Sequence, residues 1–348
     1  MRVAIATVQV PFCRGGAEVL AEGLLAACRD MGYETDLITL PFRFLPHTAV
    51  LDAMEQWENI DFTDFDVGHV DHVICLKFPT YYLKHPAKSL WLVHQHRTVY
   101  ELWGGEYDGG LHTCREGKKL KQEIHNRDAR AIREIDRRFT IGQPVSDRLK
   151  RYNKIEAPVL WPPLNDSGRF YSEDPDAYVL AVSRLQPPKR QELLIEAMHY
   201  VETPVVALIV GGGGSHGALQ QKIRELKLGD RVRLLGFLPR DVLAAFYARC
   251  LAVYFAPYDE DYGYVTLEAM LSAKPVITCA DSGGPLQFVT NNETGLVCEP
   301  DPKTVAAAID QLYRDKHRAI EMGRAGQQRY KDLDISWQKV HEKLLGNG

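Results

Sequence analysis

The chain has 348 residues, of which 45% are hydrophobic and 25% charged, and its formal net charge is −4. This length predicts two domains or one large one, and this composition is that of a globular protein with a core of ordinary size. The slightly acidic balance excludes a general affinity of the whole molecule for nucleic acid or for anionic membranes.

Seven cysteines are scattered along the chain, and none forms a C-x-x-C pair. An odd number without paired spacing indicates reduced thiols and argues against a disulfide framework or a zinc site. The first residues lack a signal-peptide pattern, because their apolar run stops at Pro11. No apolar run approaches the about 20 residues needed to cross a bilayer. We therefore expect a cytoplasmic protein.

The first part of the chain alternates strand and helix patterns. Short β-branched apolar runs predict strands at residues 2–10, 33–40, 71–78, 88–96 and 137–143. Apolar residues at helical spacing predict helices at residues 19–31, 113–136 and 146–152. This order predicts an α/β fold with a parallel, doubly wound sheet.

Three prolines within residues 156–165 indicate a linker, because proline fixes the backbone and blocks both helices and strand ladders. Beyond it the alternation resumes, with strands expected at residues 178–185, 205–213, 231–238, 251–257 and 275–280. Residues 335–346 predict a final helix. We expect an N-terminal domain at 1–163, a second domain at 164–333 and a C-terminal helix at 334–348.

The stretch DEDYGYVTLEAMLSAKPVI, residues 259–277, follows a predicted strand, and ligands of open α/β sheets bind at such strand ends. Gly263 permits a turn, and the backbone N–H groups of the next helical turn form an anion site. Glu260 and Glu268 flank this site, and carboxylates accept hydrogen bonds from sugar hydroxyls. A nucleotide-sugar, a diphosphate between two sugars, fits this arrangement. The structural alternative is a surface acidic loop followed by a helix-start glutamate.

Two other loops follow the first strands of the two halves. Arg184 and Lys189 place two cations that suit a pyrophosphate leaving group, with a solvated basic loop as the alternative. Gly15 and Gly16 lie at the matching position of the first half and offer backbone N–H groups. A glycine loop alone is a weak signal.

The sequence resembles the retaining glycosyltransferases of family 4 over almost its whole length. The resemblance, to glycogen synthases and mannosyltransferases of the glycosyl transferases group 1, rests on GGAE, SRLQPPK, LIVGGGG, LGFLP and EDYGYVTLEAMLSAKPVI followed by SGGPLQFV. The most specific motif is a pair of glutamates separated by seven residues, Glu260 and Glu268. It implies the GT-B fold, with two facing Rossmann-like domains and a C-terminal helix around Trp337 that crosses back onto the N-terminal domain.

The resemblance also implies roles for individual residues. Arg184 and Lys189 would hold the donor diphosphate, Glu268 the ribose hydroxyls, and Glu260 the transferred sugar near its reacting carbon. The other implied donor-binding residues are Gly15, Gly16, Gly212, Phe237, Leu238, Gly263, Tyr264, Val265 and Thr266. The implied reaction retains the anomeric configuration, because the leaving phosphate deprotonates the acceptor on the same face of the sugar. It needs no metal and no other cofactor.

The sequence departs from the family where many members carry a histidine near the sugar. Lys77 stands there instead, and His94 and His96 appear one strand later, at the end of the strand predicted at 88–96. We expect one of these three residues to take that role, with hydrogen-bonded structural histidines as the alternative. Residues 259–261 also look like the D-x-D metal motif of another glycosyltransferase fold, but the strand–glycine–helix context argues against a metal site.

Residues 111–154 contain thirteen lysines and arginines and six acidic residues, a net charge of +7. Such a segment predicts peripheral contact with anionic lipid at the inner membrane face, or reception of a phosphorylated, lipid-linked acceptor. The alternative is a solvated helix face.

The leading function is transfer of a sugar from a nucleotide-diphosphate sugar to a glycan or lipid-linked acceptor, with UDP favoured over GDP by family frequency. A nucleotide-sugar epimerase or hydrolase on the same fold is an alternative. Residues 210–217, VGGGGSHG, raise an NAD-binding oxidoreductase as a third function. The first βα turn lacks the G-x-G-x-x-G fingerprint that this function requires.

Overall fold

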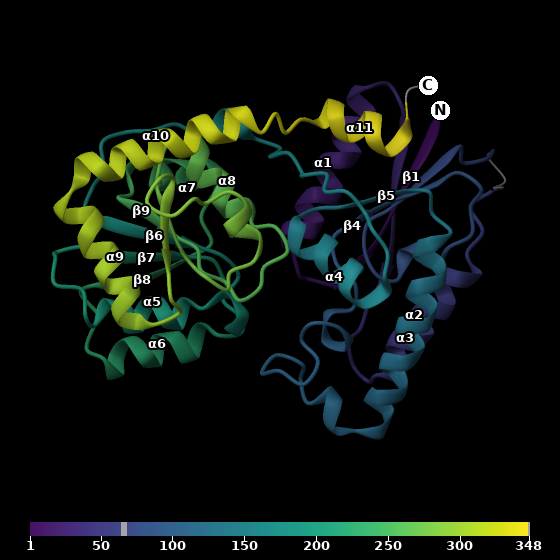
Figure 1. Ribbon diagram of the computed structural model, residues 1–348, viewed down its shortest axis with the longest axis horizontal. Helices are drawn as coiled ribbons and strands as arrows, with labels where there is room; N and C mark the ends of the chain where they lie inside the picture. The colour runs from purple at the N-terminus through teal and green to yellow at the C-terminus, as the bar shows by residue number, and fades with distance from the viewer. Residues whose placement is uncertain (64–67, 347–348) are drawn as a thin grey trace. The chain divides into compact units, whose positions relative to one another are not determined.

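The computed structural model describes residues 1–63 and 68–346. The chain divides into two compact units, one of Met1–Pro163 with Ile335–Gly348 and one of Leu164–Asp334. Each unit is built on one parallel β-sheet with α-helices packed against it (Figure 1). No helix among the described residues has the length and apolar character needed to cross a membrane.

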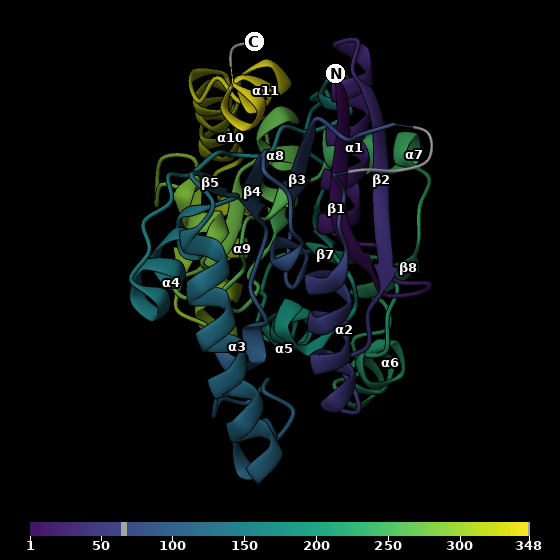
Figure 2. The same ribbon diagram turned by 90° about the vertical axis from the view of Figure 1, so that its right-hand side faces the viewer.

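The N-terminal unit contains a five-stranded sheet in the order β2-β1-β3-β4-β5, which Figure 2 shows from one edge of the sheet to the other. Its strands are β1 (Arg2–Gln9), β2 (Glu34–Pro41), β3 (His72–Cys75), β4 (Lys88–Leu92) and β5 (Arg137–Thr140). Its helices are α1 (Gly16–Asp30), α2 (Thr48–Asn59), α3 (Arg115–Arg133), α4 (Gln143–Asn153) and α11 (Trp337–Leu345). The strands pair in parallel, and β1 pairs with β2 from Arg2–Glu34 to Gln9–Pro41.

Helix α11 packs within the N-terminal unit although it lies at the far end of the sequence. The Trp337 ring meets the buried Trp91 of β4 edge-on, with ring centroids 6.2 Å apart. His341 stacks on Tyr33 at 5.0 Å, and the carbonyl of Leu345 accepts a hydrogen bond from an arginine of β5. Aromatic contacts therefore hold this short helix on the sheet.

The second unit contains a six-stranded parallel sheet in the order β11-β10-β9-β6-β7-β8. Its strands are β6 (Tyr178–Val182), β7 (Val206–Val210), β8 (Val232–Gly236), β9 (Ala252–Tyr254), β10 (Val276–Cys279) and β11 (Gly295–Cys298). Its helices are α5 (Gln191–Met198), α6 (His216–Glu225), α7 (Arg240–Arg249), α8 (Tyr264–Leu271), α9 (Pro302–Arg314) and α10 (Lys316–Asp332). The chain runs outward from β6 in one direction and then returns to β9 on its other side. The crevice between β6 and β9 is therefore a topological switch point, where doubly wound sheets bind ligands.

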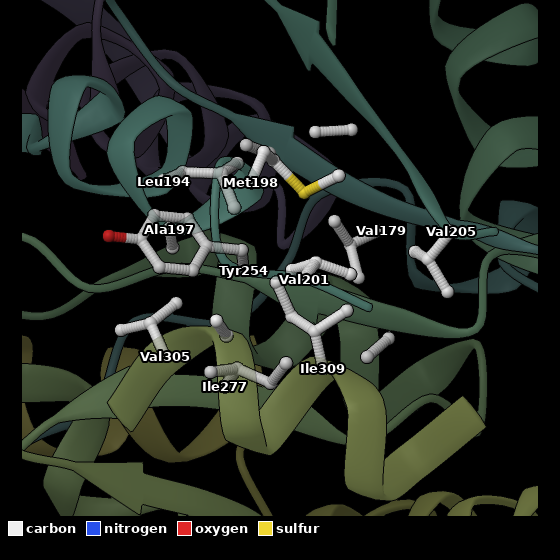
Figure 3. Close-up of a cluster of buried hydrophobic side chains, with 14 of the residues drawn as sticks. Val179, Leu194, Ala197, Met198, Val201, Val205, Tyr254, Ile277, Val305 and Ile309 are labelled. Carbon is white, nitrogen blue, oxygen red and sulfur yellow. The ribbon is translucent and has the colours of Figure 1, made fainter. Parts of the chain in front are cut away.

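Alternate residues of the central strands enter two different hydrophobic clusters. Val179 of β6 packs with side chains of α5 and α9, such as Leu194 and Ile309 (Figure 3). Leu180, the next residue, joins Tyr247 of α7 in the cluster on the opposite face. Because successive side chains of a strand point to opposite faces, helices cover the sheet on both sides. Only the loops at the ends of the strands remain to build a ligand site.

The predicted α/β fold class with parallel sheets is confirmed, and each predicted strand and helix corresponds to an observed one. The strand predicted at 88–96 is shorter, because β4 ends at Leu92. Four elements were missed. Helices α9 and α10 follow the last predicted strand, where no helix was expected before residue 335. The four-residue edge strand β11 is too short for a clear pattern, and helix α2 lies in a segment that the sequence analysis did not assign.

Replacing Gly323 by alanine should destabilise the second unit. A Cβ atom at this position of α10 would lie 2.0 Å from the carbonyl oxygen of Ala273, so the helix must move away from the turn after α8. We expect a loss of about 2 kcal/mol in the free energy of unfolding, measured by denaturant titration. Gly217→Ala is the matched control, since a Cβ there meets nothing within 4 Å and alanine favours the α6 helix. Equal stability of Gly323→Ala and the wild type would contradict this packing.

Candidate active site

Three loops meet at the carboxyl ends of β6, β9 and β10 in the second unit. The backbone N–H of Glu260 donates to the carbonyl of Ser282 at 3.0 Å, and the N–H of Gly284 donates to the carbonyl of Glu260 at 2.7 Å. Gly283 has φ +68°, and a Cβ there would lie 2.6 Å from the Glu260 carbonyl oxygen. The loops after β9 and β10 are therefore joined backbone to backbone, with no room for a side chain between them.

The loop after β6 is attached to the same assembly. Arg190 donates two hydrogen bonds of 2.6 Å to the carboxylate of Asp281, and its own carbonyl accepts from the Tyr254 hydroxyl at 3.2 Å. The Tyr254 ring lies in the aliphatic cluster of Figure 3, and its hydroxyl points away from that cluster. The N–H of Tyr258 donates to the carbonyl of Pro188 at 2.7 Å. These contacts fix the segment that carries Lys189.

Lys189 and Glu260 form an ion pair in this assembly. Lys189 Nζ lies 2.5 Å from Glu260 Oε2, and the two side chains are 15% and 22% exposed. The ammonium group also lies 5.9 Å from the centre of the Phe255 ring. Two residues that are 71 positions apart in the sequence, one expected to bind a diphosphate and the other a sugar, thus meet at one partly exposed place.

Gly263 allows the chain to turn from this loop into helix α8. Its φ is +95°, a conformation that favours glycine, and a Cβ would lie 2.8 Å from the Phe255 ring. Helix α8 begins at Tyr264, continues through Val265 and Thr266, and presents its N-terminal end to the loop assembly. The buried hydroxyls of Tyr264 and Thr266 have no hydrogen-bond partner among the described residues.

Glu268 lies one turn further along α8 and is 6% exposed. Its Oε2 accepts a 2.7 Å hydrogen bond from the Tyr247 hydroxyl, and Arg240 Nη1 lies 3.5 Å from its Oε1. Burial raises the pKa of Glu268, while the Tyr247 hydrogen bond and the Arg240 charge act in the opposite direction. The two glutamates of the motif therefore have separate partners and different exposure.

The glycine run after β7 supports the loop that carries Arg184. A Cβ on Gly211, at φ +134°, would lie 2.0 Å from the carbonyl oxygen of Ser183, and a Cβ on Gly213 would lie 2.4 Å from that of Leu185. Gln191 donates a 2.9 Å hydrogen bond to the carbonyl of Arg184. These glycines are needed because two backbones approach each other closely.

Gly212, the middle residue of this run, lies beneath the Phe237 ring, since a Cβ there would be 2.5 Å from Phe237 Cε2. Phe237 is 82% exposed, whereas Leu238 is half-buried and packs against the core beside α7. Of these predicted donor-binding residues, Phe237 is the one whose side chain is open to a ligand.

In the N-terminal unit, Lys77 and the glycine loop share a partner that the sequence analysis did not single out. Gly15 precedes α1, and its N–H donates to Glu18 Oε2 at 2.8 Å, while Gly16 is the first residue of the helix. Lys77 Nζ, which is almost fully buried, lies 3.0 Å from Glu18 Oε1. A glutamate three residues after a cap position is the signal that was overlooked. Glu18 thereby joins β1 and β3 at the switch point of this sheet.

His94 and His96 lie beyond the end of β4 in different environments. The Nδ1 atom of the half-buried His94 is 2.8 Å from the carbonyl of Gln95. His96 is buried against Phe42, Phe44 and Phe78, and burial lowers its pKa to about 3, with smaller contributions from nearby histidines. His96 is therefore neutral at physiological pH and lies in an aromatic cluster, which favours the structural alternative for this residue.

No group of three or more histidine, cysteine, aspartate or glutamate side chains is placed to hold a metal ion within residues 1–63 and 68–346. The acidic residues at 259–261 are included in this statement.

Residues 166–329, nearly the whole second unit, match the family model of glycosyl transferases group 1. The chain is 30% identical to human alpha-1,3/1,6-mannosyltransferase ALG2 over 226 residues, 57% of this chain and 53% of that protein. It is 35% identical over 179 residues to the GDP-mannose-dependent alpha-(1-6)-phosphatidylinositol monomannoside mannosyltransferase of Mycobacterium tuberculosis, covering 48% and 46%. The chain spans about half the length of these curated relatives.

Solved structures of glycosyltransferases resemble the chain over nearly its whole length. Sucrose-phosphate synthase from Thermosynechococcus elongatus superposes with a TM-score of 0.80 at 19% identity, covering 97% of this chain and 96% of that one. Anabaena Alr3699/HepE in complex with UDP-glucose superposes with a TM-score of 0.71 at 17% identity, covering 99% and 98%. At these identities the similarity shows the fold. The expected GT-B fold class, with two Rossmann-like parallel-sheet domains, is confirmed.

His96→Phe should weaken the dependence of stability on acid. The pKa of His96 is lower in the folded protein than its ordinary value of 6.5, so the unfolded chain binds the proton first and stability falls as pH drops below about 6.5. We expect the wild type to lose about 2 kcal/mol through this residue at pH 5, and the variant to lose correspondingly less. Denaturant titrations from pH 7.5 to 5 measure this difference.

His69→Gln is the control for this experiment, because the His69 side chain is 72% exposed. It should keep the acid dependence of the wild type. An identical pH profile for His96→Phe and the wild type would contradict the buried, neutral state of His96.

Proposed function

We propose that the protein is a retaining glycosyltransferase that moves a sugar from a nucleoside-diphosphate sugar to a glycan or lipid-linked acceptor. One observation carries this proposal. Glu260 forms an ion pair with Lys189 at the switch point of the second sheet. Glu260 lies in the loop that leads into helix α8, which carries Glu268. This pair lies within residues 166–329, which match the family model of glycosyl transferases group 1.

In this proposal the second unit binds the donor. The diphosphate lies near Lys189 and Arg184 and faces the N-terminal end of α8, where the backbone dipoles favour negative charge. Glu260 accepts hydrogen bonds from the transferred sugar and Glu268 from the ribose. Phe237 offers an exposed ring to the base from above Gly212. The cations stabilise the charge that develops on the leaving diphosphate, so no metal is required.

For the nucleotide base of the donor, the names of the relatives support one choice. Family frequency favours UDP, whereas the mycobacterial relatives that are 33% and 35% identical to this chain are named GDP-mannose-dependent mannosyltransferases. The structural neighbours that contain UDP are below 20% identical and carry no argument about the base. We therefore propose a GDP-mannose donor, with UDP-sugars as the competing class.

We propose that the N-terminal unit binds the acceptor and that its basic segment, residues 111–154, contributes to this binding. Many of its cations are paired, such as Arg127 with Glu58 and Glu123, and Lys150 with Glu156. The exposed side chains of Arg115, Lys118 and Lys119 gather instead at the start of α3. Peripheral contact with an anionic membrane, on the cytoplasmic side, is proposed for this end of the helix.

Binding experiments test the donor site without knowledge of the acceptor. Thermal shifts are measured in EDTA with GDP, UDP, ADP, GDP-mannose and UDP-glucose, and with NAD as a control, because a ligand of the folded state raises its stability. We expect a shift with one nucleoside diphosphate and a larger one with its sugar. A shift with NAD alone would overturn the proposal, and donor breakdown without acceptor would favour a hydrolase or epimerase.

Lys189→Ala should weaken binding of that nucleoside diphosphate about tenfold or more, because it removes a cation from the phosphates. Glu260→Ala should remove the additional shift caused by the sugar and leave the nucleotide shift in place. Both variants should melt close to the wild type, since the pair is partly exposed.

Lys222→Ala is the matched control for Lys189→Ala. Lys222 pairs with Glu192 and Glu196 in the same unit, and its side chain is 28% exposed. It should bind every ligand like the wild type. Wild-type affinities in both Lys189→Ala and Glu260→Ala would rule out this donor site.

The membrane proposal predicts that Lys118→Glu/Lys119→Glu lowers sedimentation with vesicles of phosphatidylglycerol and phosphatidylcholine. Two charge reversals remove about 2 kcal/mol or more of attraction to an anionic surface at low salt. Lys150→Glu/Lys154→Glu on α4 and the residue after it changes the net charge equally and should bind like the wild type. Equal binding by all three proteins, or no binding by the wild type, would contradict the proposal.

A further inference from the structure

Glu268 is a buried carboxylate whose position depends on helix α7. It is 6% exposed, and a charged group at such depth is costly unless it is paired and hydrogen-bonded. Its partners Arg240 and Tyr247 are seven residues apart, two helical turns, and so lie on the same side of α7. One helix therefore holds both oxygens of the carboxylate.

The two partners differ in how firmly they hold Glu268. The Tyr247 hydroxyl is fully buried and donates to Oε2 at 2.7 Å. Arg240 is exposed in part, lies 3.5 Å from Oε1, and also contacts Asp166 at 3.3 Å. The shorter and better protected contact is the one from Tyr247. It fixes the rotation of the carboxylate within the cluster beside α8.

A carboxylate oxygen accepts about two hydrogen bonds, so Tyr247 and Arg240 leave one further acceptor position on each oxygen of Glu268. A vicinal diol donates two hydrogen bonds with a spacing that matches the two oxygens of one carboxylate. We propose that Tyr247 is a positioning residue, which orients Glu268 so that its two oxygens accept the two ribose hydroxyls of the nucleoside-diphosphate donor. This inference rests on the proposed function, and it adds a residue that the motif does not contain.

The groups around Glu268 set the sign of a pH effect. Tyr247 and Arg240 of α7 lower the pKa of Glu268, whereas burial and the charge of Asp166 raise it. Burial and the nearby Glu268 charge raise the pKa of Tyr264 of α8. Loss of the Tyr247 hydroxyl therefore raises the pKa of the carboxyl. Binding that needs the carboxylate should then fail at a higher pH in Tyr247→Phe than in the wild type as the solution is acidified.

The experiment compares ribose and deoxyribose ligands by calorimetry. The dissociation constants of GDP and dGDP, and of UDP and dUDP, are measured for the wild type and Tyr247→Phe between pH 5 and 8. We expect the wild type to bind the better ribonucleotide about tenfold more tightly than its 2′-deoxy analogue. In Tyr247→Phe this ratio should fall to about threefold or less, while affinity for the deoxy analogue changes little. The variant's ribonucleotide binding should also fall off at a higher pH.

Tyr178→Phe is the matched control. This variant loses a hydrogen bond of the same 2.7 Å length. In the wild type that bond runs from the Tyr178 hydroxyl to the carbonyl of Phe246 and not to Glu268. It should keep the wild-type ratio and pH profile, and melting curves of both variants report on folding. An unchanged ratio in a folded Tyr247→Phe would overturn the inference and leave the proposed function standing. A wild type that binds no nucleoside diphosphate would overturn both.

Discussion

Burial of both faces of the second sheet determines where this unit can act. Val179 and Leu180 are neighbours in β6, and each is enclosed by a different set of helices. Polar groups cannot be placed on either face without a large cost, so chemistry is confined to the strand ends. The reversal of direction between β6 and β9 then separates two loops enough to admit a ligand. Lys189 arrives from one loop and Glu260 from the other.

In the N-terminal unit, a buried carboxylate joins the loops at the strand ends. Its buried carboxylate is Asp128 of α3, which is fully enclosed and accepts hydrogen bonds from the hydroxyls of Tyr81, Tyr82 and Tyr100 and from the Gln95 amide. Burial raises the pKa of Asp128, and these hydrogen bonds oppose that effect. Because its partners follow β3 and β4, one side chain holds the loops at the carboxyl end of this sheet, as Glu260 does through its backbone in the second unit.

The sequence alone predicted most of the fold because buried parallel strands leave a strong signal. Their continuous apolar runs are visible at 178–185 and 205–213, and the glycine turns between them mark where helices begin. The edge strand β11 had no such run, and the end of β4 was misplaced by four residues because Val93 continues its apolar pattern. His96 was thus considered for a cleft position, whereas the structure places it among phenylalanines.

Within the candidate site, the motif pointed to Glu260, Glu268 and the two cations, but it did not reveal what holds them. Tyr247 lies in an amphipathic helix, where an aromatic residue usually means core packing. Arg190 and Asp281 are 91 residues apart, and their pairing depends on the order of strands in the sheet. Contacts of this kind follow from tertiary topology, which a local pattern of residues does not encode.

The close approach of backbones around the site has a consequence for how such proteins diversify. At Gly211, Gly213 and Gly283, any side chain would collide with a main-chain carbonyl of a neighbouring loop, so these positions admit almost no substitution. The Phe237 side chain lies over Gly212 and extends into solvent. Natural variation should therefore be found in side chains that lie beside these glycines, such as Phe237. A designed library that aims to alter ligand choice should change the same side chains, because nearly every variant at the three glycines would be lost.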